Sequence, residues 1–237
     1  MQISKVFSSG GFVLHETSKV VSIVTFNSSN IKTGPMHQIW HLVKALKPQE
    51  ALKSGLNSLV CGNCPLQGDS KGKNRACYVK LFQGPRAIWQ KWNRGGYPQV
   101  FELDDIAAIF KGAAVRFGAY GNPSILPVEV VSTIVKSARK HTGYIHNWRT
   151  VSDEYARFFM ASVESELDRQ QAKQKGYRTF RIVHDASETL AGEIICPSES
   201  KGITCLECGL CGGYSRSAKD IAITVHGKGK KNLKKDV

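Results

Sequence analysis

The sequence has no hydrophobic run long enough to cross a membrane. Its longest apolar stretches, such as Val20–Phe26, are much shorter than the roughly 20 residues that a membrane span needs. Residues 1–16 also lack the long apolar core that precedes the cleavage site of a secretory signal. These two absences predict a cytoplasmic protein with no membrane partner.

Acidic residues are scarce relative to basic ones, and cysteines are few. The 237 residues include 19 Asp and Glu against 33 Lys and Arg, which gives a formal net charge of +14. Seven cysteines are too few for a disulfide scaffold, and clustered cysteines in a reducing compartment more often bind metal than form disulfides. Because 41% of the residues are apolar, a chain of this length can bury a core without covalent support.

Several catalytic motifs are also missing. The sequence has neither a G-x-x-x-x-G-K-[ST] phosphate loop nor a G-x-G-x-x-G fingerprint. No His-x-Glu or Cys-x-Glu step precedes either cysteine group at a helix start, as a zinc deaminase would need. His141 and His146 are too far apart to form the H-x-H pair of nicking enzymes, and Asp104 and Asp105 are interpreted as part of a helix cap. A nuclease or replication initiator is therefore only an alternative.

Short β-branched and aromatic segments alternate with amphipathic ones along the chain. This alternation, clearest in residues 103–183, predicts βα units and a mainly parallel sheet. Only about six strands are visible, so we expect an α/β fold with a partial (βα) barrel or an open sheet rather than a full barrel of eight strands. The expected strands are Val20–Phe26, Ala114–Tyr120, Gly143–Asn147, Arg157–Val163, Tyr177–Val183 and Glu193–Ile195. The expected helices are Met36–Lys47, Pro48–Ser54, Pro85–Asn93, Leu103–Lys111, Pro127–Lys140, Val151–Ala156 and Ser165–Lys175.

Two cysteine-rich segments interrupt this alternation. Residues 61–84 hold three cysteines among Gly, Asn and Lys, and residues 196–214 hold four among Ser and Gly. We expect a single α/β domain over residues 1–226 that carries both segments as loops. The Lys-rich tail over residues 227–237 has no apolar periodicity, and we expect it to be disordered.

All seven cysteines fall in these two loops. A C-x2-C step places two sulfurs on the same side of a tight loop, within reach of one metal. Buried structural thiols are the alternative, but the clustering into two short loops favours metal binding. The first group is Cys61-x2-Cys64-x12-Cys77, and the second is Cys196-x8-Cys205-x2-Cys208-x2-Cys211.

The second group favours an iron–sulfur cluster over zinc. Cys205, Cys208 and Cys211 form the overlapping C-x2-C-x2-C triple of ferredoxins, in which a further cysteine precedes a proline. Both Cys196 and Cys64 precede a proline. Zinc sites more often pair two C-x2-C knuckles, or one knuckle with histidine. We therefore favour a [4Fe–4S] cluster, with zinc as the alternative.

The first group has three cysteines and needs a fourth ligand. Candidates are His37, His41, His146, a cysteine of the second group or an exogenous molecule. An iron–sulfur cube with one open iron would be a catalytic arrangement, because an unprotected corner can bind substrate or cofactor. The alternative is a zinc site of three cysteines and one histidine that stabilises the loop.

Polar residues end several expected strands, where ligands bind in α/β folds. Residues 116–123 end one strand, residues 144–148 the next and residues 160–164 a third. The loop over residues 30–34 could bind phosphate through a lysine and backbone N–H groups, or simply cap the following helix. Asn122-Pro123 could equally be a plain turn. The candidate catalytic residues are Tyr120, Asn122 and His146, and the candidate cofactor-binding residues are Lys32, Arg116 and Tyr144.

Much of the net positive charge lies in two segments. Residues 61–96 contain seven basic residues against one aspartate, and residues 228–237 contain five against one. The first segment also holds Tyr78, Phe82, Trp89 and Trp92. Basic residues interleaved with aromatics suit single-stranded nucleic acid, although the tryptophans could instead be core anchors. The candidate nucleic-acid-binding residues are Lys71, Lys73, Arg75, Lys80, Arg86, Lys91, Arg94, Lys228, Lys230 and Lys231.

Several stretches together resemble a known family. They are residues 30–36, 61–65, 77–78, 116–123, 142–148, 160–163 and 176–181, together with the second cysteine group. On these residues the chain resembles a family of uncharacterised function carried by bacteriophages and mobile elements. That family is distantly similar to radical S-adenosylmethionine enzymes, which have a partial barrel.

The resemblance implies a barrel-like fold, paired cysteine sites and S-adenosylmethionine as a further cofactor. It also implies location in the host cytoplasm. Two departures are visible: the first group does not have the C-x3-C-x2-C spacing of radical enzymes, and Asn122 stands where the family has an aspartate.

The sequence therefore predicts an iron–sulfur or zinc protein that binds or acts on DNA or RNA. If it is an enzyme of the radical type, the first cysteine group would be the reactive centre, and the second would be structural or relay electrons. The main alternative is a zinc-stabilised nucleic-acid-binding accessory protein of replication or transcription without enzymatic activity. The oligomeric state is left open.

Overall fold

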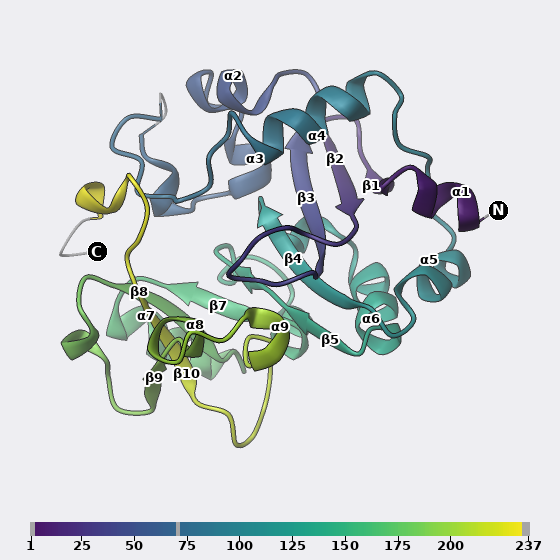
Figure 1. Ribbon diagram of the computed structural model, residues 1–237. Helices are drawn as coiled ribbons and strands as arrows, with labels where there is room; N and C mark the ends of the chain where they lie inside the picture. The colour runs from purple at the N-terminus through teal and green to yellow at the C-terminus, as the bar shows by residue number, and fades with distance from the viewer. Residues whose placement is uncertain (1–2, 70–71, 234–237) are drawn as a thin grey trace.

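The strands of this protein form two five-stranded sheets. The computed structural model describes residues 3–69 and 72–233 (Figure 1). The first sheet has the order β1-β2-β3-β4-β5 and the second the order β6-β7-β8-β10-β9. The strands are β1 (Gly11–Glu16), β2 (Val20–Thr25), β3 (His37–Val43), β4 (Ala114–Tyr120), β5 (Lys140–Thr142), β6 (Tyr144–Ile145), β7 (Met160–Val163), β8 (Thr179–Val183), β9 (Glu193–Ile195) and β10 (Asp220–Thr224).

The two sheets differ in strand direction and adjoin at one glycine. In the first sheet β1, β2 and β3 are antiparallel neighbours, while β3, β4 and β5 are parallel. The second sheet is parallel throughout. Only Gly143 separates β5 from β6, and a Cβ there would lie 2.7 Å from the ring of Phe159. The chain therefore passes from one sheet to the other at a position that is too crowded for a side chain.

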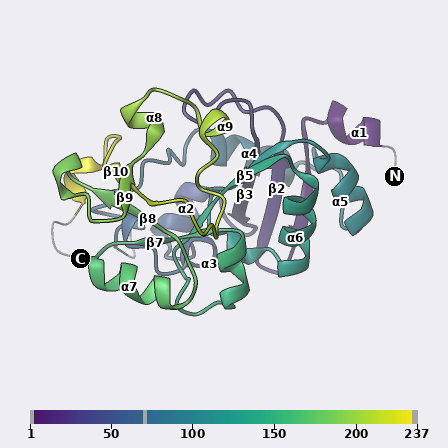
Figure 2. The same cartoon turned by 90° about the horizontal axis from the view of Figure 1, so that it is seen from below.

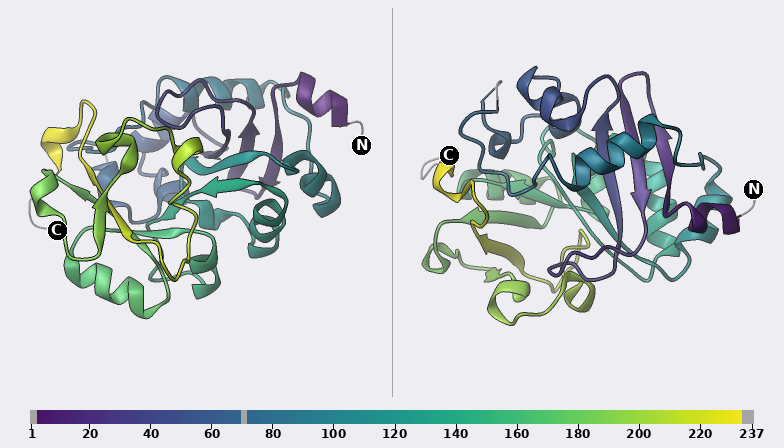
Figure 3. Two further views of the ribbon diagram at one scale, coloured as in Figure 1. Left: turned by 60° about the horizontal axis from the view of Figure 1, so that its bottom comes forward. Right: turned by 45° about the horizontal axis from the view of Figure 1, so that its top comes forward.

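Helices cover both faces of this layer, as Figures 2 and 3 show. One face packs on α5, α6 and α7, and the main hydrophobic core lies between them and the strands. The α-helices are α1 (Ile3–Ser8), α2 (Pro48–Lys53), α3 (Ser58–Cys61), α4 (Gly84–Asn93), α5 (Leu103–Phe110), α6 (Val128–Ser137), α7 (Glu166–Gln174), α8 (Pro197–Ser200) and α9 (Cys205–Cys208). Short 3-10 helices are η1 (Pro65–Gln67), η2 (Pro123–Ile125), η3 (Asp153–Arg157), η4 (Ala186–Glu188) and η5 (Lys230–Asn232).

The opposite, inner face is covered in two separate places. Helices α2, α3 and α4 pack on the first sheet through a second core that includes Ala51, Val60 and Trp89. The second cysteine loop packs on the second sheet through a smaller core around Met160 and Phe180. The strands direct polar side chains to the part of the inner face that lies between these two packed regions.

The alternation of residues along β4 explains why this face is polar. Val115 and Phe117 point into the main core, so Arg116 and Tyr120 point to the inner face. Tyr144 on β6, in the second sheet, faces the same side, and its ring stacks there on Phe180 of β8 at 4.2 Å.

The α/β class is confirmed, and within the described residues the strands do not close into a barrel. The expected strands Ala114–Tyr120 and Glu193–Ile195 match β4 and β9. The sheets hold more strands than the expected six, because β1, β3, β5 and β10 were not predicted. One of the sheets is also mixed rather than parallel.

The prediction of a helix over Met36–Lys47 is wrong. This segment contains β3, which pairs with β2 on one side and β4 on the other. Five of its seven residues are buried, and a short apolar run that is buried on both faces has no periodicity to distinguish strand from helix. An α-helix was also expected over residues 151–156, but this segment overlaps the 3-10 helix η3 instead.

The last described residues lie against the first cysteine loop. The helix η5 falls within the tail that was expected to be disordered, and the side chain of Asn232 donates to the carbonyl of Arg75 at 3.1 Å. Residues 234–237 lie outside the described residues. Among the helices that the structure describes, none has the length and apolar character of a membrane span.

Candidate functional site

The first cysteine group lies beside the carboxyl end of β4. Cys61 is the last residue of α3, and Cys64 directly precedes η1. The N–H groups of Ala76 and Cys77 both donate to the carbonyl of Leu66, at 3.1 and 2.8 Å. These two hydrogen bonds hold residues 76–77 beside the start of the loop, so Cys77 lies near Cys61 and Cys64.

The end of β4 is tied to α3 through a close approach of backbones. The N–H of Asn122 donates to the carbonyl of Val60 at 2.7 Å. Gly121 has a φ of 83°, and a Cβ at this position would lie 2.7 Å from the Cβ of His41. Only glycine fits both the backbone conformation and the space. The contact fixes the first cysteine group relative to the strand.

His146 reaches the first group from the end of β6. Its Nε2 lies 3.4 Å from the Sγ of Cys64. Its Nδ1 is buried without a hydrogen bond, 3.8 Å from Oε1 of Glu164 at the end of β7. Metal-binding histidines commonly present their second ring nitrogen to a carboxylate in this way. Of the three histidines considered as fourth ligand, His146 is the one that the structure brings to the cysteines.

The other two histidines have different environments. The ring of His37 packs between Phe26 and Phe110, with centroid distances of 4.8 and 6.2 Å. His41 is fully buried, and its Nδ1 lies 2.8 Å from the hydroxyl of Ser22. Neither of them lines the cavity described below.

Burial disfavours charged thiolates in the first group. It raises the pKa of the Cys61 thiol, and the nearby Cys64 and Cys77 raise it further. Burial is also the largest cause of the raised pKa of Cys77. For His146 burial alone would lower the pKa, but Cys64 and Glu164 outweigh it and raise the pKa to about 10. A bound cation would stabilise the deprotonated sulfurs, so this donor set fits a metal.

The second cysteine group surrounds the opposite end of the inner face. Cys196 directly follows β9, Cys205 and Cys208 are the first and last residues of α9, and Cys211 comes after a left-handed turn at Gly209. Cys196 and Cys64 occupy equivalent positions, since each is the N-cap of a short helix that begins with proline. The Cys-Pro steps noticed in the sequence therefore start two similar turns, one at each group.

Contacts from three other segments hold the second cysteine loop in place. The Nζ of Lys140 donates to the carbonyl of Leu206 at 2.7 Å, and a guanidinium nitrogen of Arg178 donates to that of Leu210 at 2.6 Å. The N–H of Cys205 donates to a carbonyl of the loop between β2 and β3 at 2.9 Å. These contacts join distant parts of the sequence around the four sulfurs.

The thiols of the second group also influence one another. Burial raises the pKa of Cys196, Cys205 and Cys211, and in each case other cysteines of the group add to the effect. All seven cysteines of the chain are free thiols. In the described residues no three Cys, His, Asp or Glu side chains are grouped so that they could hold one ion. A cluster does not need that convergence, since each of its irons takes a different thiolate.

Both cysteine groups line a single cavity of about 170 Å³ on the inner face. Every cysteine except Cys208 lines it. Among the described residues the lining contains no aspartate or glutamate, although it contains a lysine and an arginine. The six polar residues singled out in the sequence all line this cavity: Lys32, Arg116, Tyr120, Asn122, Tyr144 and His146.

Hydrogen bonds to neighbouring side chains orient two of the candidate catalytic residues. The hydroxyl of Tyr120 donates to the side-chain oxygen of Asn57, and burial raises the pKa of this phenol. The amide of Asn122 donates to Oδ1 of Asn147 at 2.6 Å, which also accepts from Ser124 at 2.9 Å. The structure thus gives Tyr120 and Asn122 positioning contacts and also places them on the cavity wall.

Tyr78 lines the cavity, although the sequence did not identify it as a catalytic or cofactor-binding candidate. Its hydroxyl accepts a hydrogen bond from a guanidinium nitrogen of Arg116 at 2.5 Å, and its ring packs on His226 at 5.0 Å. These contacts join residues that are far apart in the sequence, so no local motif announces them. The signals in the sequence were its position one residue after Cys77 and its place among the aromatic residues of the basic segment.

The basic candidates divide into exposed and internally bonded residues. Arg75 donates to the carbonyls of Cys77 and Val79, at 3.0 and 2.7 Å. Lys91 donates to the carbonyl of Ser9 and lies over an aromatic ring. Lys71 lies outside the described residues. The exposed candidates are Lys73, Lys80, Arg86, Arg94, Lys228, Lys230 and Lys231.

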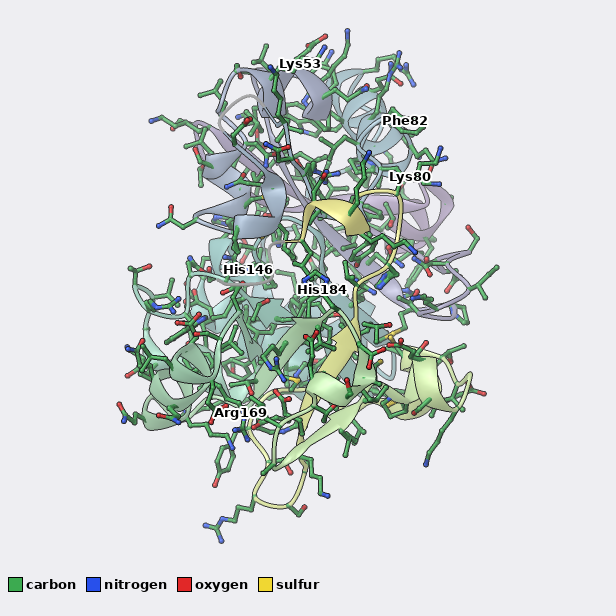
Figure 4. The ribbon with its side chains drawn as sticks, turned by 90° about the vertical axis from the view of Figure 1, so that its left-hand side faces the viewer. Lys53, Lys80, Phe82, His146, Arg169 and His184 are labelled. Atoms are coloured by element: carbon green, nitrogen blue, oxygen red, sulfur yellow. The ribbon has the colours of Figure 1, made fainter. Side chains whose placement is uncertain are left out.

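The aromatic residues of the basic segment divide in the same way. Trp89 and Trp92 pack into the second core, so they are core anchors. Tyr78 and Phe82 are 41% and 56% exposed, which leaves their rings available for stacking. Figure 4 shows the C-terminal segment passing between the labelled Lys80 and His184.

No protein-family model matches the chain, and neither the curated proteins nor the solved structures gave a significant match. The function must therefore be argued from the site itself.

Proposed function

We propose that this chain is a metalloprotein with two cysteine-ligated centres that acts on nucleic acid at the cavity between them. Its first centre would be held by Cys61, Cys64, Cys77 and His146, and its second by Cys196, Cys205, Cys208 and Cys211. The observation that carries the proposal is that both cysteine groups, from opposite halves of the chain, line the same cavity. Two loops that served only to stabilise the fold would have no reason to share it.

The donors favour a [4Fe–4S] cluster at the second centre. Four thiols with C-x2-C-x2-C spacing can each bind a different iron, whereas a zinc ion would bring its sulfurs to about 3.8 Å from one another. An iron–sulfur cluster supplies one-electron transfer. The role of the protein is to exclude water and to hold the centre beside the cavity, which the packing of Cys196 and Cys211 against the Met160–Phe180 core supports.

The role of the first centre depends on His146. With its Nε2 only 3.4 Å from Cys64, His146 is positioned to occupy the fourth coordination position. An open corner for S-adenosylmethionine would require this imidazole to move away. The radical-enzyme hypothesis therefore includes a displacement of His146, while a closed centre of three cysteines and one histidine would leave the cavity to bind substrate only.

The position of the exposed basic residues supports nucleic acid as the substrate class. The C-terminal segment with Lys228, Lys230 and Lys231 lies against the segment that carries Tyr78 and Lys80, and Tyr78 also lines the cavity. Exposed lysines therefore lie on the two segments that line the cavity through Tyr78 and His226, and the ring of Tyr78 is itself 41% exposed. This combination suits a single strand whose phosphates pair with lysines and whose bases stack.

A second candidate function is a zinc-stabilised nucleic-acid-binding protein without catalysis. The observation that favours it is the residue types of the first group, because three cysteines and one histidine are a common zinc ligand set and Glu164 lies behind the imidazole. Binding a single zinc ion would require these side chains to move closer together than they lie in the structure. In this case the cavity would have no reaction to support.

Metal analysis of the full chain, prepared without oxygen, separates the two functions. We expect iron and sulfide in equal amounts and the broad visible absorption of an iron–sulfur cluster. The double variant C205S/C211S should lose the second centre, and C61S/C64S should lose the first. A colourless protein that contains only zinc would support the second candidate, and a protein without metal would contradict both.

A further inference from the structure

Arg116 is a buried cation on the inner face with no acidic partner. It is 8% exposed and lines the cavity between the cysteine groups. Its side chain makes one hydrogen bond within the described residues, to the hydroxyl of Tyr78, and no carboxylate lies within 4.0 Å of it there. Burial of an unpaired charge is costly, so a charge without a partner in the protein points to one outside it.

The other buried arginines of the described residues each have several acceptors in the protein, although the Nε of Arg178 has none. Arg169 pairs with Asp220 at 3.1 Å, and Arg181 forms two hydrogen bonds to Glu193 at 3.0 and 2.7 Å. Arg178 donates to three backbone carbonyls. Each of these three guanidinium groups therefore donates to at least two acceptors in the protein, whereas Arg116 donates to one.

The surroundings of Arg116 are suited to an anion. Its neighbours on the cavity wall include Lys32 and Asn30, and the wall contains no carboxylate among the described residues. Tyr78 accepts from one nitrogen of the guanidinium, and the other N–H groups have no acceptor among the described residues. A planar fork of N–H donors matches two oxygens of a phosphate or a carboxylate.

We propose that Arg116 binds the anionic group, phosphate or carboxylate, of the molecule that enters this cavity. Lys32 adds charge, and Tyr78 fixes the guanidinium. The inference deepens the proposed function, on which it rests for the role of the cavity, by assigning a charge to the substrate and a residue that recognises it. Phosphate would be the group of a nucleic-acid substrate, and carboxylate that of an amino-acid-like cofactor or substrate.

One rival explanation also arises from the geometry. Cys205 lies near enough to influence Arg116 electrostatically, so the guanidinium could instead balance a metal-bound thiolate. The two explanations differ in what is lost when the charge is removed. An anion subsite would lose ligand affinity, whereas a partner of the metal centre would lose metal.

The test is calorimetric titration of the metal-loaded full chain with inorganic phosphate and, separately, with acetate. We expect saturable binding of at least one anion, weakened about 10- to 100-fold in R116Q and less in R116K, because a charge-assisted hydrogen bond of about 1.5–3 kcal/mol is removed. The matched control is R216Q, which removes the same charge from an exposed arginine outside the cavity. Preference for phosphate or acetate identifies the chemical source.

The metal content of each variant is measured first and keeps the two proposals separate. Retained metal with weakened anion binding in R116Q supports the subsite. Unchanged anion binding in R116Q, equal weakening in R216Q, or no saturable binding to the unaltered protein would overturn it. Loss of metal from R116Q alone would also overturn it, in favour of charge balance at Cys205. A wild-type chain without metal would contradict the proposed function instead.

Discussion

The Nε2 of His146 lies 3.4 Å from the Sγ of Cys64, although 82 positions separate the two residues in the chain. β6 delivers the histidine to the inner face, and the turn before η1 delivers the cysteine. Behind the imidazole, Glu164 stands 3.8 Å from Nδ1. The role of this thiol, imidazole and carboxylate in metal binding can be tested by changing Glu164.

Replacing Glu164 by glutamine should weaken metal binding at the first centre about 10- to 100-fold, because the carboxylate orients the imidazole and raises its basicity. The measurement is competition for the metal with a chelator of known affinity. E154Q is the matched control, since Glu154 is exposed on η3. Equal metal affinity of E164Q and the unaltered protein would show that the carboxylate does not support the imidazole of His146 at this centre.

Removing the charges of Lys228, Lys230 and Lys231 together should weaken binding to single-stranded DNA and flatten its dependence on salt. Each lost phosphate contact reduces the slope of log K against log salt by about 0.7, so the slope should fall by about 2. Fluorescence anisotropy over a series of salt concentrations measures it.

The control for this triple variant is K5Q/K53Q/K111Q, which removes the same net charge from exposed lysines elsewhere on the surface. Figure 4 shows Lys53 well away from His184 and the C-terminal segment. If both triple variants change the slope equally, the attraction comes from net charge and not from this surface.

Gly143 should not tolerate alanine. A Cβ there would lie 2.7 Å from the ring of Phe159 and 3.0 Å from the Cβ of Phe117, so the junction between the sheets would be overpacked. We expect the free energy of unfolding to fall by about 1–3 kcal/mol. Urea unfolding measures it, with G212A as the control, because a Cβ at Gly212 meets its nearest atom at 3.4 Å. Equal stability of the two variants would contradict the crowding.

Stability should fall as the pH drops below 6.5, in part because of His41. Burial, assisted by the charge of His15, lowers the pKa of His41 from 6.5 to about 3. Between these values the unfolded chain binds a proton that the folded protein does not, so the free energy of unfolding decreases by up to about 1.4 kcal/mol per pH unit.

Urea unfolding between about pH 7 and pH 5 tests this contribution against the variant H41Q. The glutamine cannot take up a proton, so H41Q should lose less stability over the same range. An identical slope in both proteins would mean that His41 does not contribute to the acid sensitivity.

Local patterns determined a recognisable part of this protein. The β-branched run at Ala114–Tyr120 defined β4, and the prolines at positions 48 and 85 marked the starts of α2 and α4. The cysteine spacing defined two groups, because a C-x2-C step places two thiols together whatever the remainder of the chain does. Polar residues in and after the expected strands, together with the loop over residues 30–34, likewise identified six residues that line the cavity.

Tertiary structure decided what depends on burial and on distant contacts. Residues 37–43 form a strand because β2 and β4 pair with them on both sides, while their apolar run was equally consistent with a helix. Trp89 became a core residue, and Arg116 became a cation without a carboxylate. The position of His146 beside Cys64, and the lining of one cavity by both cysteine groups, follow from the packing of loops and strands that are distant in the sequence. These contacts join residues that are far apart in the chain, so the spacing of residues along the sequence does not predict them.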